Sequence, residues 1–423
     1  QAVLLFIGVQ RHHRILRSLL PETWLPLVPP GLMACSGSPT QQAKLYRLNS
    51  ERASSLSTTA PCSEEWEASN PEFRVAEEQS AFTPWLSPLT GHLSPLHSFF
   101  DTEDIQRWEP GRFRLEHKLQ SAPRNFGQVQ RMFDAASGAH VAVKQMPNKW
   151  LCECHAEFMM QYRIETERPW VDIGCTAFIN SVAYPYACPL VGVFRDNQST
   201  YVVSELATEG DLFSWASCSC QNPGPAREAS GRPLARQLLD ALRRLHDLSI
   251  VHRDVSAENV LVTRRAGDGA LQLQLIDFGM ATASRFNRCG TRGKASYQSP
   301  EAHFGEMCDG FLLDAFAVGV TLYVMLVREY PWISTRPGGC KAFEYFRKRG
   351  FHSLVEKRKL CGQTTTVAQH MSQPLAQLLA GLLAVNPADR LSLGEATWFA
   401  AGNERRSVWQ EPWVRAAPSW CGA

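Results

Sequence analysis

The pattern of hydrophobic and polar positions separates a strand-rich part of the chain from a helical part that follows it. Residues 112–119, 127–133, 140–146 and 199–206 alternate between the two kinds of position, as half-buried strands do. Turn-forming residues at 134–138 join the second run to the third. We therefore predict a small β-rich lobe in this part of the chain.

After about residue 211 the spacing of apolar residues becomes helical. Leucines recur on one face of a helix predicted over 233–248, at Leu234, Leu238, Leu242 and Leu245. Further elements are predicted as a strand at 271–276 and helices at 313–327, 374–385 and 393–400. This order of elements indicates an α+β fold in which a small β-rich lobe precedes a larger helical lobe. A cleft between two such lobes is a natural ligand site.

The beginning of the chain shows neither period. Residues 34 to about 108 are rich in Ser, Pro, Thr and Glu, and such a segment cannot bury enough apolar surface to offset the entropy of ordering it. We expect residues 1–111 to form a disordered arm with a few docking aromatic residues, such as Trp85 and Phe99. Ordered structure should begin near Arg112, and residues 401–423 should form a C-terminal tail.

The first residues do not resemble a secretory signal. The apolar run at 2–9 is too short to span a bilayer, and its positive residues follow the run instead of preceding it. The chain begins at Gln1, and its first methionine is Met33. We expect synthesis to start at Met33, so that residues 1–32 are not native.

One other stretch, residues 311–327, is apolar enough to suggest a membrane helix. It is shorter than the roughly 20 residues that a spanning helix needs, and it carries Asp314 near its start. A buried core helix is the better interpretation, so we expect no membrane span.

Composition narrows the class of protein only slightly. Of the 423 residues, 44% are hydrophobic and 20% charged, and the net charge is +2. Nucleic-acid binders show an excess of lysine and arginine, so we expect no nucleic-acid partner. The 13 cysteines include the C-x-C pairs Cys152/Cys154 and Cys218/Cys220, which lack a second ligand pair at zinc-finger spacing. Free thiols in a reducing, cytoplasmic compartment are the simpler interpretation.

Three polar residues converge on the predicted cleft. Asp254 and Asn259 lie on a tight loop between the helix over 233–248 and a β-branched run, and Asp277 follows the strand at 271–276. A hairpin between the two segments would bring Asp277 beside Asp254. Carboxylate and amide oxygens are the ligands that Mg²⁺ prefers, and the remaining carboxylate can orient an attacking hydroxyl.

These residues belong to a set of motifs that resembles the eukaryotic protein kinase superfamily, of the serine/threonine type, over residues 112 to about 400. The motifs are "VAVK" with Lys144, "HRDVSAEN", "DFG" at 277–279, "SPE" at 299–301, "DAFAVGVTLY" at 314–323 and "NPADR" ending at Arg390. Each is weak alone, but they occur together in the expected order. The resemblance implies a bilobal kinase fold with a nucleotide cleft between its lobes.

The resemblance also implies roles for individual residues. Lys144 would hold the α- and β-phosphates of ATP, Asp254 would accept or orient the substrate hydroxyl, and Asn259 and Asp277 would hold Mg²⁺. The remaining nucleotide contacts would come from Gly127 in the phosphate-covering loop, Val129, Ala142 and Leu261 around the adenine, the backbone of Glu205 and Ala207 at its edge, and Asp211 at the ribose. The alternative for Lys144 is a solvated strand lysine.

The sequence departs from the kinase pattern in the phosphate-covering loop. Ala122 and Arg124 stand at the first two of its three glycine positions, and only Gly127 remains. Side chains there would hold the backbone away from the phosphates. Arg124 would either contribute its charge directly or face solvent.

The acid that pairs with Lys144 is also uncertain from the sequence. The register of the preceding segment points to Cys175, but Asp172 lies on the same helical face one turn earlier. Glu165 and Glu167 precede Pro169 and so lie outside the predicted helix. We predict Asp172.

A further departure affects catalysis directly. Ser256 stands where serine/threonine kinases carry a lysine that touches the transferred phosphate, and Lys294 stands where they carry a threonine that packs against that lysine. We expect Lys294 to reach across to Asp254 and the γ-phosphate and so to supply the missing charge. The alternative is that Lys294 points into solvent.

The segment between Asp277 and Glu301 is called the activation segment below. The resemblance implies a buried ion pair between Glu301 and Arg390 that ties this segment to the helical lobe. It also implies that Asp314 accepts hydrogen bonds from backbone N–H groups of the catalytic loop, which is the "HRDVSAEN" motif at residues 252–259. A phosphate on Thr291 would pair with Arg253.

The sequence therefore predicts an ATP- and Mg²⁺-dependent protein kinase that phosphorylates serine or threonine in a protein substrate. The alternative is a pseudokinase scaffold, which the altered glycine loop favours. A small-molecule phosphotransferase fits less well, because such enzymes lack the "SPE" segment. Residues 336–359 are rich in lysine and arginine, and they form either a solvated helical face or a docking site for an acidic partner.

Overall fold

The computed structural model describes residues 95–122, 126–218, 221–400 and 405–416, all within one compact unit of the chain, Gln42–Ala423. Its strands are β1 Gln106–Arg107, β2 Phe113–Ala122, β3 Gly127–Asp134, β4 Ala139–Pro147, β5 Leu190–Arg195, β6 Ser199–Glu205, β7 Val260–Arg264, β8 Leu271–Leu275, β9 Phe286–Arg288 and β10 Met307–Asp309. Its α-helices are α2 Asn148–Leu151, α3 His155–Gln161, α4 Pro169–Ser181, α5 Leu212–Cys218, α6 Pro225–Asp247, α7 Gly310–Val327, α8 Lys341–Lys357, α9 Gln373–Leu382, α10 Ala396–Ala400 and α11 Pro412–Arg415.

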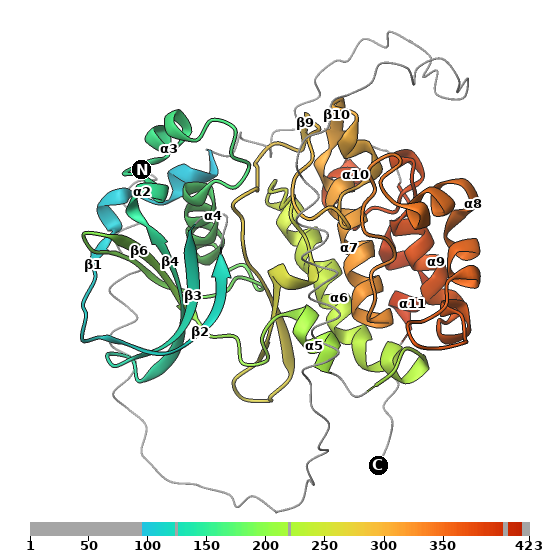
Figure 1. The fold of residues 1–423 in the computed structure, drawn as a ribbon, viewed down its shortest axis with the longest axis horizontal. Helices are drawn as coiled ribbons and strands as arrows, with labels where there is room; N and C mark the ends of the chain where they lie inside the picture. The colour runs from blue at the N-terminus through green and yellow to red at the C-terminus, as the bar shows by residue number, and fades with distance from the viewer. Residues whose placement is uncertain (1–94, 123–125, 219–220, 401–404, 417–423) are drawn as a thin grey trace, which may run out of the picture. The chain divides into compact units, whose positions relative to one another are not determined.

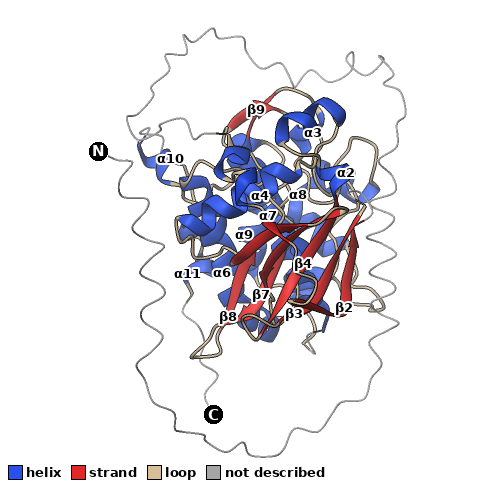
Figure 2. Ribbon diagram, turned by 90° about the vertical axis from the view of Figure 1, so that its left-hand side faces the viewer, coloured by secondary structure: helices blue, strands red, loops and turns tan. Residues whose placement is uncertain are grey.

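The β-rich lobe is a sheet in the order β1-β5-β6-β4-β3-β2. Its neighbouring strands are antiparallel, except that β1 pairs in parallel with β5. Along β4 the apolar residues Val141 and Val143 are buried, whereas Ala142 and Lys144 next to them are partly exposed, as the alternating pattern predicts. The helix α4 lies beside this sheet (Figure 1; Figure 2).

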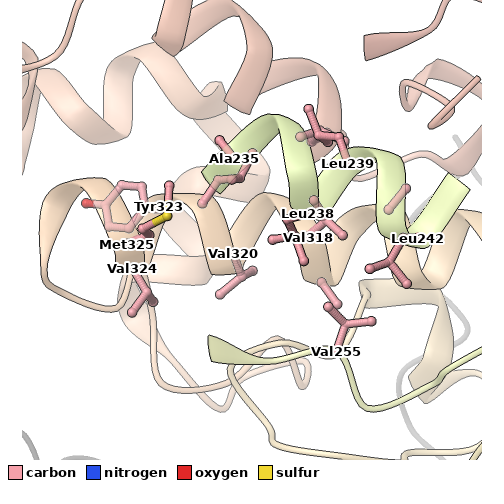
Figure 3. Packing of buried hydrophobic residues seen from close by; sticks show 14 of the residues in the cluster. Ala235, Leu238, Leu239, Leu242, Val255, Val318, Val320, Tyr323, Val324 and Met325 are labelled. Carbon is pink, nitrogen blue, oxygen red and sulfur yellow. The ribbon is translucent and has the colours of Figure 1, made fainter. Parts of the chain in front are cut away.

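The helical lobe is organised around α6 and α7. The four leucines that predicted a helical face are all buried, and Leu238 and Leu242 lie with Val318 and Val320 of α7 in one packed cluster (Figure 3). The 18-residue helix α7 is long and apolar enough to cross a membrane, but 94% of it is buried inside the protein. The prediction of a core helix at this place is therefore confirmed. It is the only helix in the described residues with that length and apolarity.

The hairpin β7–β8 follows α6 and the catalytic loop. Its register pairs Val260 with Leu275, so the residues just before β7 lie beside those just after β8. Ile276 N donates to Asn259 O at 3.1 Å as a result. The hairpin thereby brings the catalytic loop to the start of the activation segment, as the spacing of the motifs predicts.

Several boundaries differ from the sequence prediction, and the largest difference is at the start of one helix. The helix predicted over 233–248 begins earlier, at Pro225, because Arg227 and Glu228 in its first turns are buried and hydrogen-bonded to distant segments. Pro233 therefore lies inside the helix instead of at its start, because these tertiary contacts extend the helix before it. The last predicted helix, 393–400, is shorter and spans Ala396–Ala400.

The expectation of a disordered arm up to residue 111 is wrong for residues 95–111. This stretch contains two 3₁₀ helices, η2 Leu96–Phe99 and η3 Thr102–Asp104, and the strand β1. Leu96 is buried, and the ring of Phe99 packs on Phe178 of α4 at 4.4 Å between centroids. Phe99 therefore docks as expected, but with ordered backbone around it. Trp85 and Met33 lie outside the described residues.

The expectation of free thiols is wrong for one pair. Cys289 and Cys308 form a disulfide, whereas Cys152, Cys154 and Cys218 are free. Cys308 lies within β10 and Cys289 directly follows β9, and these strands pair with each other. Neither strand was predicted, so the sequence could not bring the two cysteines together.

Candidate active site

Lys144 is held by an acid from α4. Its Nζ donates to Asp172 Oδ2 at 2.8 Å, and Asp172 Oδ1 accepts a hydrogen bond from Phe278 N at 2.8 Å. Burial alone would lower the pKa of Lys144, but the charges of Asp172 and Asp277 outweigh it and raise the pKa. One buried carboxylate thus fixes the lysine to the backbone of the "DFG" motif, and the ammonium remains charged.

The prediction that Asp172 is the partner of Lys144 is confirmed. Pro169 begins α4, so Asp172 lies in the first turn of the helix. Cys175, the residue that the register of the sequence first suggested, is fully buried one turn further along. A carboxylate in the first turn is also favoured by the positive end of the helix dipole.

The two predicted metal ligands lie at the open end of the β7–β8 hairpin. Asn259 directly precedes β7, and Asp277 follows β8. Asp277 Oδ1 is 3.9 Å from Lys144 Nζ. Burial tends to raise the pKa of Asp277, but the charges of Lys144 and Lys294 outweigh it and lower the pKa. Asp277 is therefore a carboxylate at neutral pH, which is the form that binds a cation.

Asp254 is oriented by Asn259. The Nδ2 of Asn259 donates to the backbone oxygen of Asp254 at 2.9 Å and to its Oδ2 at 3.0 Å. The other carboxylate oxygen, Oδ1, is buried and has no hydrogen-bond partner among the described residues. Burial raises the pKa of Asp254, and the charge of Lys294 partly offsets this effect. An unpaired carboxylate oxygen of this kind can accept a proton or a hydrogen bond from a hydroxyl group.

The catalytic loop is anchored on Asp314 of α7. Its carboxylate accepts from His252 N at 2.7 Å and from Arg253 N at 2.9 Å, as predicted. The same carboxylate lies 3.1 Å from His246 Nε2, and His246 Nδ1 lies 2.8 Å from Glu395 Oε1. Burial disfavours the charged imidazole, but these two carboxylates outweigh it and raise the pKa of His246 to about 9.

The sequence did not indicate His246 and Glu395 as parts of the site, because neither lies in a recognised motif. The available signal was a single histidine in the last turn of an amphipathic helix that leads into the catalytic loop. A titratable group at such a place needs a buried partner, and Asp314 was the acid already expected nearby.

Lys294 crosses from the activation segment to the catalytic loop. Its Nζ donates to Ser256 Oγ at 2.7 Å and to Asn259 Oδ1 at 3.5 Å, and it lies 3.8 Å from Glu258 Oε2. Its side chain is 34% exposed. The alternative that Lys294 simply points into solvent is therefore excluded, and the ammonium lies beside the residue that replaces the usual lysine.

The predicted ion pair between Glu301 and Arg390 is present. Arg390 Nη1 donates to Glu301 Oε1 at 2.6 Å and its Nη2 donates to Oε2 at 2.9 Å. The guanidinium also donates to the backbone oxygens of Leu312 and Ala384. Arg390 is fully buried, so this bidentate pair ties the end of the activation segment to the helical lobe.

The residues expected around the adenine lie on strands β3, β4, β6 and β7 and on the segment that connects the two lobes. Ala142 pairs with Ser204 next to Glu205, and Leu261 forms an isolated bridge with Asp211. The predicted nucleotide residues that are partly exposed are Gly127, Val129, Ala142, Ala207, Asp211 and Leu261, and Glu205 is exposed. Ala122 at the end of β2 pairs with Gly127 at the start of β3, so the two ends of the phosphate-covering loop lie side by side. Arg124 lies outside the described residues.

The donor set fits a magnesium nucleotide. Asn259 supplies an amide oxygen and Asp277 a carboxylate, which are hard-oxygen ligands, and Mg²⁺ usually takes its other positions from phosphates and water. Lys144 would hold phosphate oxygens on the opposite side. When bound, the metal would neutralise charge on the transferred phosphoryl group.

Comparisons with known proteins agree with this geometry. The model of the protein kinase domain matches residues 125–400. CBL-interacting protein kinase 1 of Oryza sativa subsp. japonica is 28% identical over 297 residues, which cover 68% of this chain and 56% of that protein. Serine/threonine-protein kinase SRK2J of Arabidopsis thaliana is 32% identical over 203 residues, which cover 47% of this chain and 55% of that protein.

A third relative, serine/threonine-protein kinase PLK4 of Drosophila grimshawi, is 31% identical over 216 residues, covering 50% of this chain and 25% of that protein. The chain spans about half the length of the first relatives that it matches. The family model covers well over half of the chain, and the fold has the expected β-rich and helical lobes. The chain belongs to the protein kinase family.

Proposed function

We propose that this protein is an active, ATP- and Mg²⁺-dependent kinase that transfers the γ-phosphate to serine or threonine hydroxyls of a protein substrate. The observation that carries the proposal is the bridge through Asp172, which binds Lys144 Nζ with one oxygen and Phe278 N with the other. This bridge keeps the ammonium within 3.9 Å of Asp277.

In the proposed reaction, Lys144 holds the α- and β-phosphates, and Asn259 and Asp277 hold the magnesium ion. Asp254 orients the attacking hydroxyl with its unpaired oxygen and takes up its proton as transfer proceeds. Lys294 places its ammonium at the γ-phosphate, where Ser256 offers no charge. The adenine lies against Val129, Ala142 and Leu261. Glu205 and Ala207 bind its edge through backbone groups, Asp211 binds the ribose and Gly127 covers the phosphates.

A pseudokinase scaffold is the second candidate. The glycine loop supports it, because Ala122 and Arg124 replace two of the glycines that let a backbone approach phosphate closely. The residues of the catalytic site argue against it, since Lys144, Asp254, Asn259 and Asp277 are all retained with mutually consistent geometry.

Incubation of the purified chain with radiolabelled ATP, Mg²⁺ and a mixture of Ser, Thr and Tyr peptides tests the proposal. We expect label on serine or threonine, and none with the Asp277→Asn variant. Calorimetry with ATP in the presence and absence of Mg²⁺ provides the second measurement. Metal-dependent binding without transfer would favour the pseudokinase, and no binding would contradict both candidates.

We further propose a cytoplasmic location and an acidic partner or substrate segment at residues 336–359. The exposed basic side chains of this segment are Arg336, Lys341, Lys348, Arg349, Lys357 and Lys359. Arg358 is excluded from this surface, because it donates to the backbone oxygens of Pro331 and Tyr330. Several relatives are named as CBL-interacting kinases, which supports a protein partner in addition to the substrate.

A further inference from the structure

The disulfide between Cys289 and Cys308 closes residues 289–308 into a loop that contains the second half of the activation segment. The two strands at the base of this loop, β9 and β10, pair through only three residues each. A two-stranded ribbon of that length is marginally stable by itself. Beside the disulfide, the base is held by the ion pair between Arg285 Nη2 and Asp309 Oδ2, at 2.6 Å.

The closed loop carries the residues that touch the catalytic loop. Lys294 Nζ donates to Ser256 Oγ at 2.7 Å. Gly293 packs directly on Asp254, because a Cβ at position 293 would overlap the carboxylate oxygen Oδ1. Both residues follow Cys289 within a few positions, so the position of Cys289 constrains where they lie.

Like charges oppose this arrangement. Arg292 of the activation segment interacts electrostatically with Arg253 of the catalytic loop and with Arg168 at the start of α4. The Nε atoms of Arg168 and Arg292 are buried without a hydrogen-bond partner among the described residues. Burial and the charge of Arg168 lower the pKa of Arg292. Burial and the charge of Arg292 lower the pKa of Arg253 to about 10, although Asp314 partly offsets them. The segment is thus held against electrostatic repulsion.

We propose that Cys289 and Cys308 form a reversible thiol–disulfide site, and that the disulfide clamps the activation segment onto the catalytic loop. The proposal rests on the proposed function, because the clamp acts on Asp254 and Lys294. Oxidation supports phosphoryl transfer, and reduction releases the segment. Lys144, Asp172 and Asp277 lie outside the loop, so the nucleotide site persists in both forms.

The co-reactant is a low-molecular-weight disulfide of the glutathione class. The partly exposed Cys289 thiolate attacks it, forms a mixed disulfide and releases one thiol. The Cys308 thiolate then attacks the Cys289 sulfur and releases the second thiol. Two protein thiols are oxidised with loss of two protons and two electrons, and one small disulfide is reduced to two thiols. A small dithiol such as dithiothreitol reverses the reaction.

The test compares the full chain equilibrated with oxidised glutathione and with dithiothreitol. Peptide mapping reports whether Cys289 and Cys308 are joined, limited proteolysis reports the exposure of residues 285–309, and peptide phosphorylation reports turnover. Because cross-linking a loop of this size restricts its open conformations strongly, we expect reduction to raise cleavage in 285–309 and to lower kcat/KM about tenfold or more. Metal-dependent ATP binding should stay within about twofold.

Two variants separate the clamp from general effects of reduction. C289S/C308S should match the reduced wild type under both conditions. C361S removes an exposed free thiol and should respond to oxidation like the wild type. Equal cleavage of oxidised and reduced wild type, a redox response retained by C289S/C308S, or Cys289 and Cys308 found unjoined after oxidation would each overturn the proposal. Cleavage needs no turnover, so it tests the clamp even if the chain transfers no phosphate.

The repulsion has its own test. Arg292→Gln removes one of the three converging charges, so reduction should raise cleavage less in R292Q than in the wild type. An undiminished response in R292Q would refute the electrostatic part of the proposal.

Discussion

Lys144 and Asp172 are joined by a hydrogen bond of 2.8 Å between Nζ and Oδ2, although they lie 28 positions apart in a strand and a helix. Because the other oxygen of Asp172 binds the backbone of Phe278, a shift of α4 would disturb both the lysine and the "DFG" motif. The arrangement makes the position of α4 a condition for assembling the nucleotide site.

The first prediction concerns this bridge. Asp172→Ala leaves Lys144 without its nearest carboxylate and Phe278 N without its acceptor. Hydrogen bonds to charged groups contribute about 1.5–3 kcal/mol, so we expect kcat/KM for ATP to fall about 10- to 100-fold. Steady-state kinetics at varied ATP concentration measure the change. Glu165→Gln, an exposed acid just before α4, should retain wild-type kinetics, and equal losses in both variants would contradict the assignment.

The second prediction concerns Lys294, whose ammonium replaces the positive charge that is missing at Ser256. Lys294→Met removes the ammonium beside Ser256, and loss of one preorganised donor at a developing charge costs about 10²–10³ in kcat. The double variant S256K/K294T returns the ammonium to the opposite side of the same 2.7 Å contact and should recover much of this loss. Lys149→Met is the control, because Lys149 is exposed on α2. A Lys294→Met enzyme with unchanged kcat would show that the charge is not used.

Much of the site could be predicted from the sequence, because its residues lie in short motifs whose local geometry is fixed. Asp172 could be found because Pro169 marks a helix start and the helical period fixes the face. Asp314 could be placed because an acid in an apolar helix needs buried donors. Lys294 could be paired with Ser256 because both lie at a fixed offset from a motif.

The parts that could not be predicted depend on contacts between distant segments. Leu96 and Phe99 lie at the end of a region rich in Ser, Pro, Thr and Glu, and they pack against α4, which is distant along the chain. The disulfide depends on β9 and β10, whose three residues each are too few to give a periodic signal. His246 and Glu395 are 149 positions apart, and no local pattern joins them.

The third prediction uses the charge of His246. Its pKa is raised to about 9 in the folded protein, above the ordinary value of about 6.5. The stabilisation is therefore complete below pH 6.5 and is lost as the pH rises through 9. A shift of this size corresponds to about 3 kcal/mol for a fully buried group.

Urea unfolding at pH 6, 7.5 and 9 measures this dependence. The free energy of unfolding should fall between pH 6.5 and 9 in the wild type, and the fall should be smaller in His246→Gln. A wild-type slope that equals the slope of the variant would rule out a charged His246. Since Asp314 also holds the catalytic loop, kcat should decline over the same range.

The fourth prediction concerns the packing of η2 against α4. Gly174 allows the backbone of Leu96 to approach α4, and a Cβ there would overlap the carbonyl oxygen of Leu96. Gly174→Ala should displace η2, because overpacking costs about 1–3 kcal/mol. Hydrogen exchange of residues 95–100 should rise in this variant, whereas Thr176→Ala, on the same helix, should leave it unchanged.

The docking of η2 should also depend on pH. His97 and His155 stack with ring centroids 3.8 Å apart. Burial, the neighbouring His97 and Arg168 lower the pKa of His155 to about 4, and burial and Arg168 lower the pKa of His97. Both rings are therefore neutral when docked, and docking should weaken as the pH falls from 6.5 towards 4. Exchange at residues 95–100 that is slower at pH 5 than at pH 7.5 would contradict this sign.

The fifth prediction concerns the buried ion pair of Glu301 and Arg390. Glu301→Ala leaves a fully buried guanidinium without its carboxylate, and breaking a buried pair in this way costs about 3–5 kcal/mol. The free energy of unfolding from urea titration should fall by that amount. Glu306→Ala removes an exposed acid of the same chain segment and should change stability by less than about 0.5 kcal/mol.

Because the backbone oxygens of Leu312 and Ala384 also bind Arg390, a loss near the lower end of the range would mean that they retain the guanidinium. A stability equal to that of Glu306→Ala would mean that the pair does not hold the activation segment to the helical lobe.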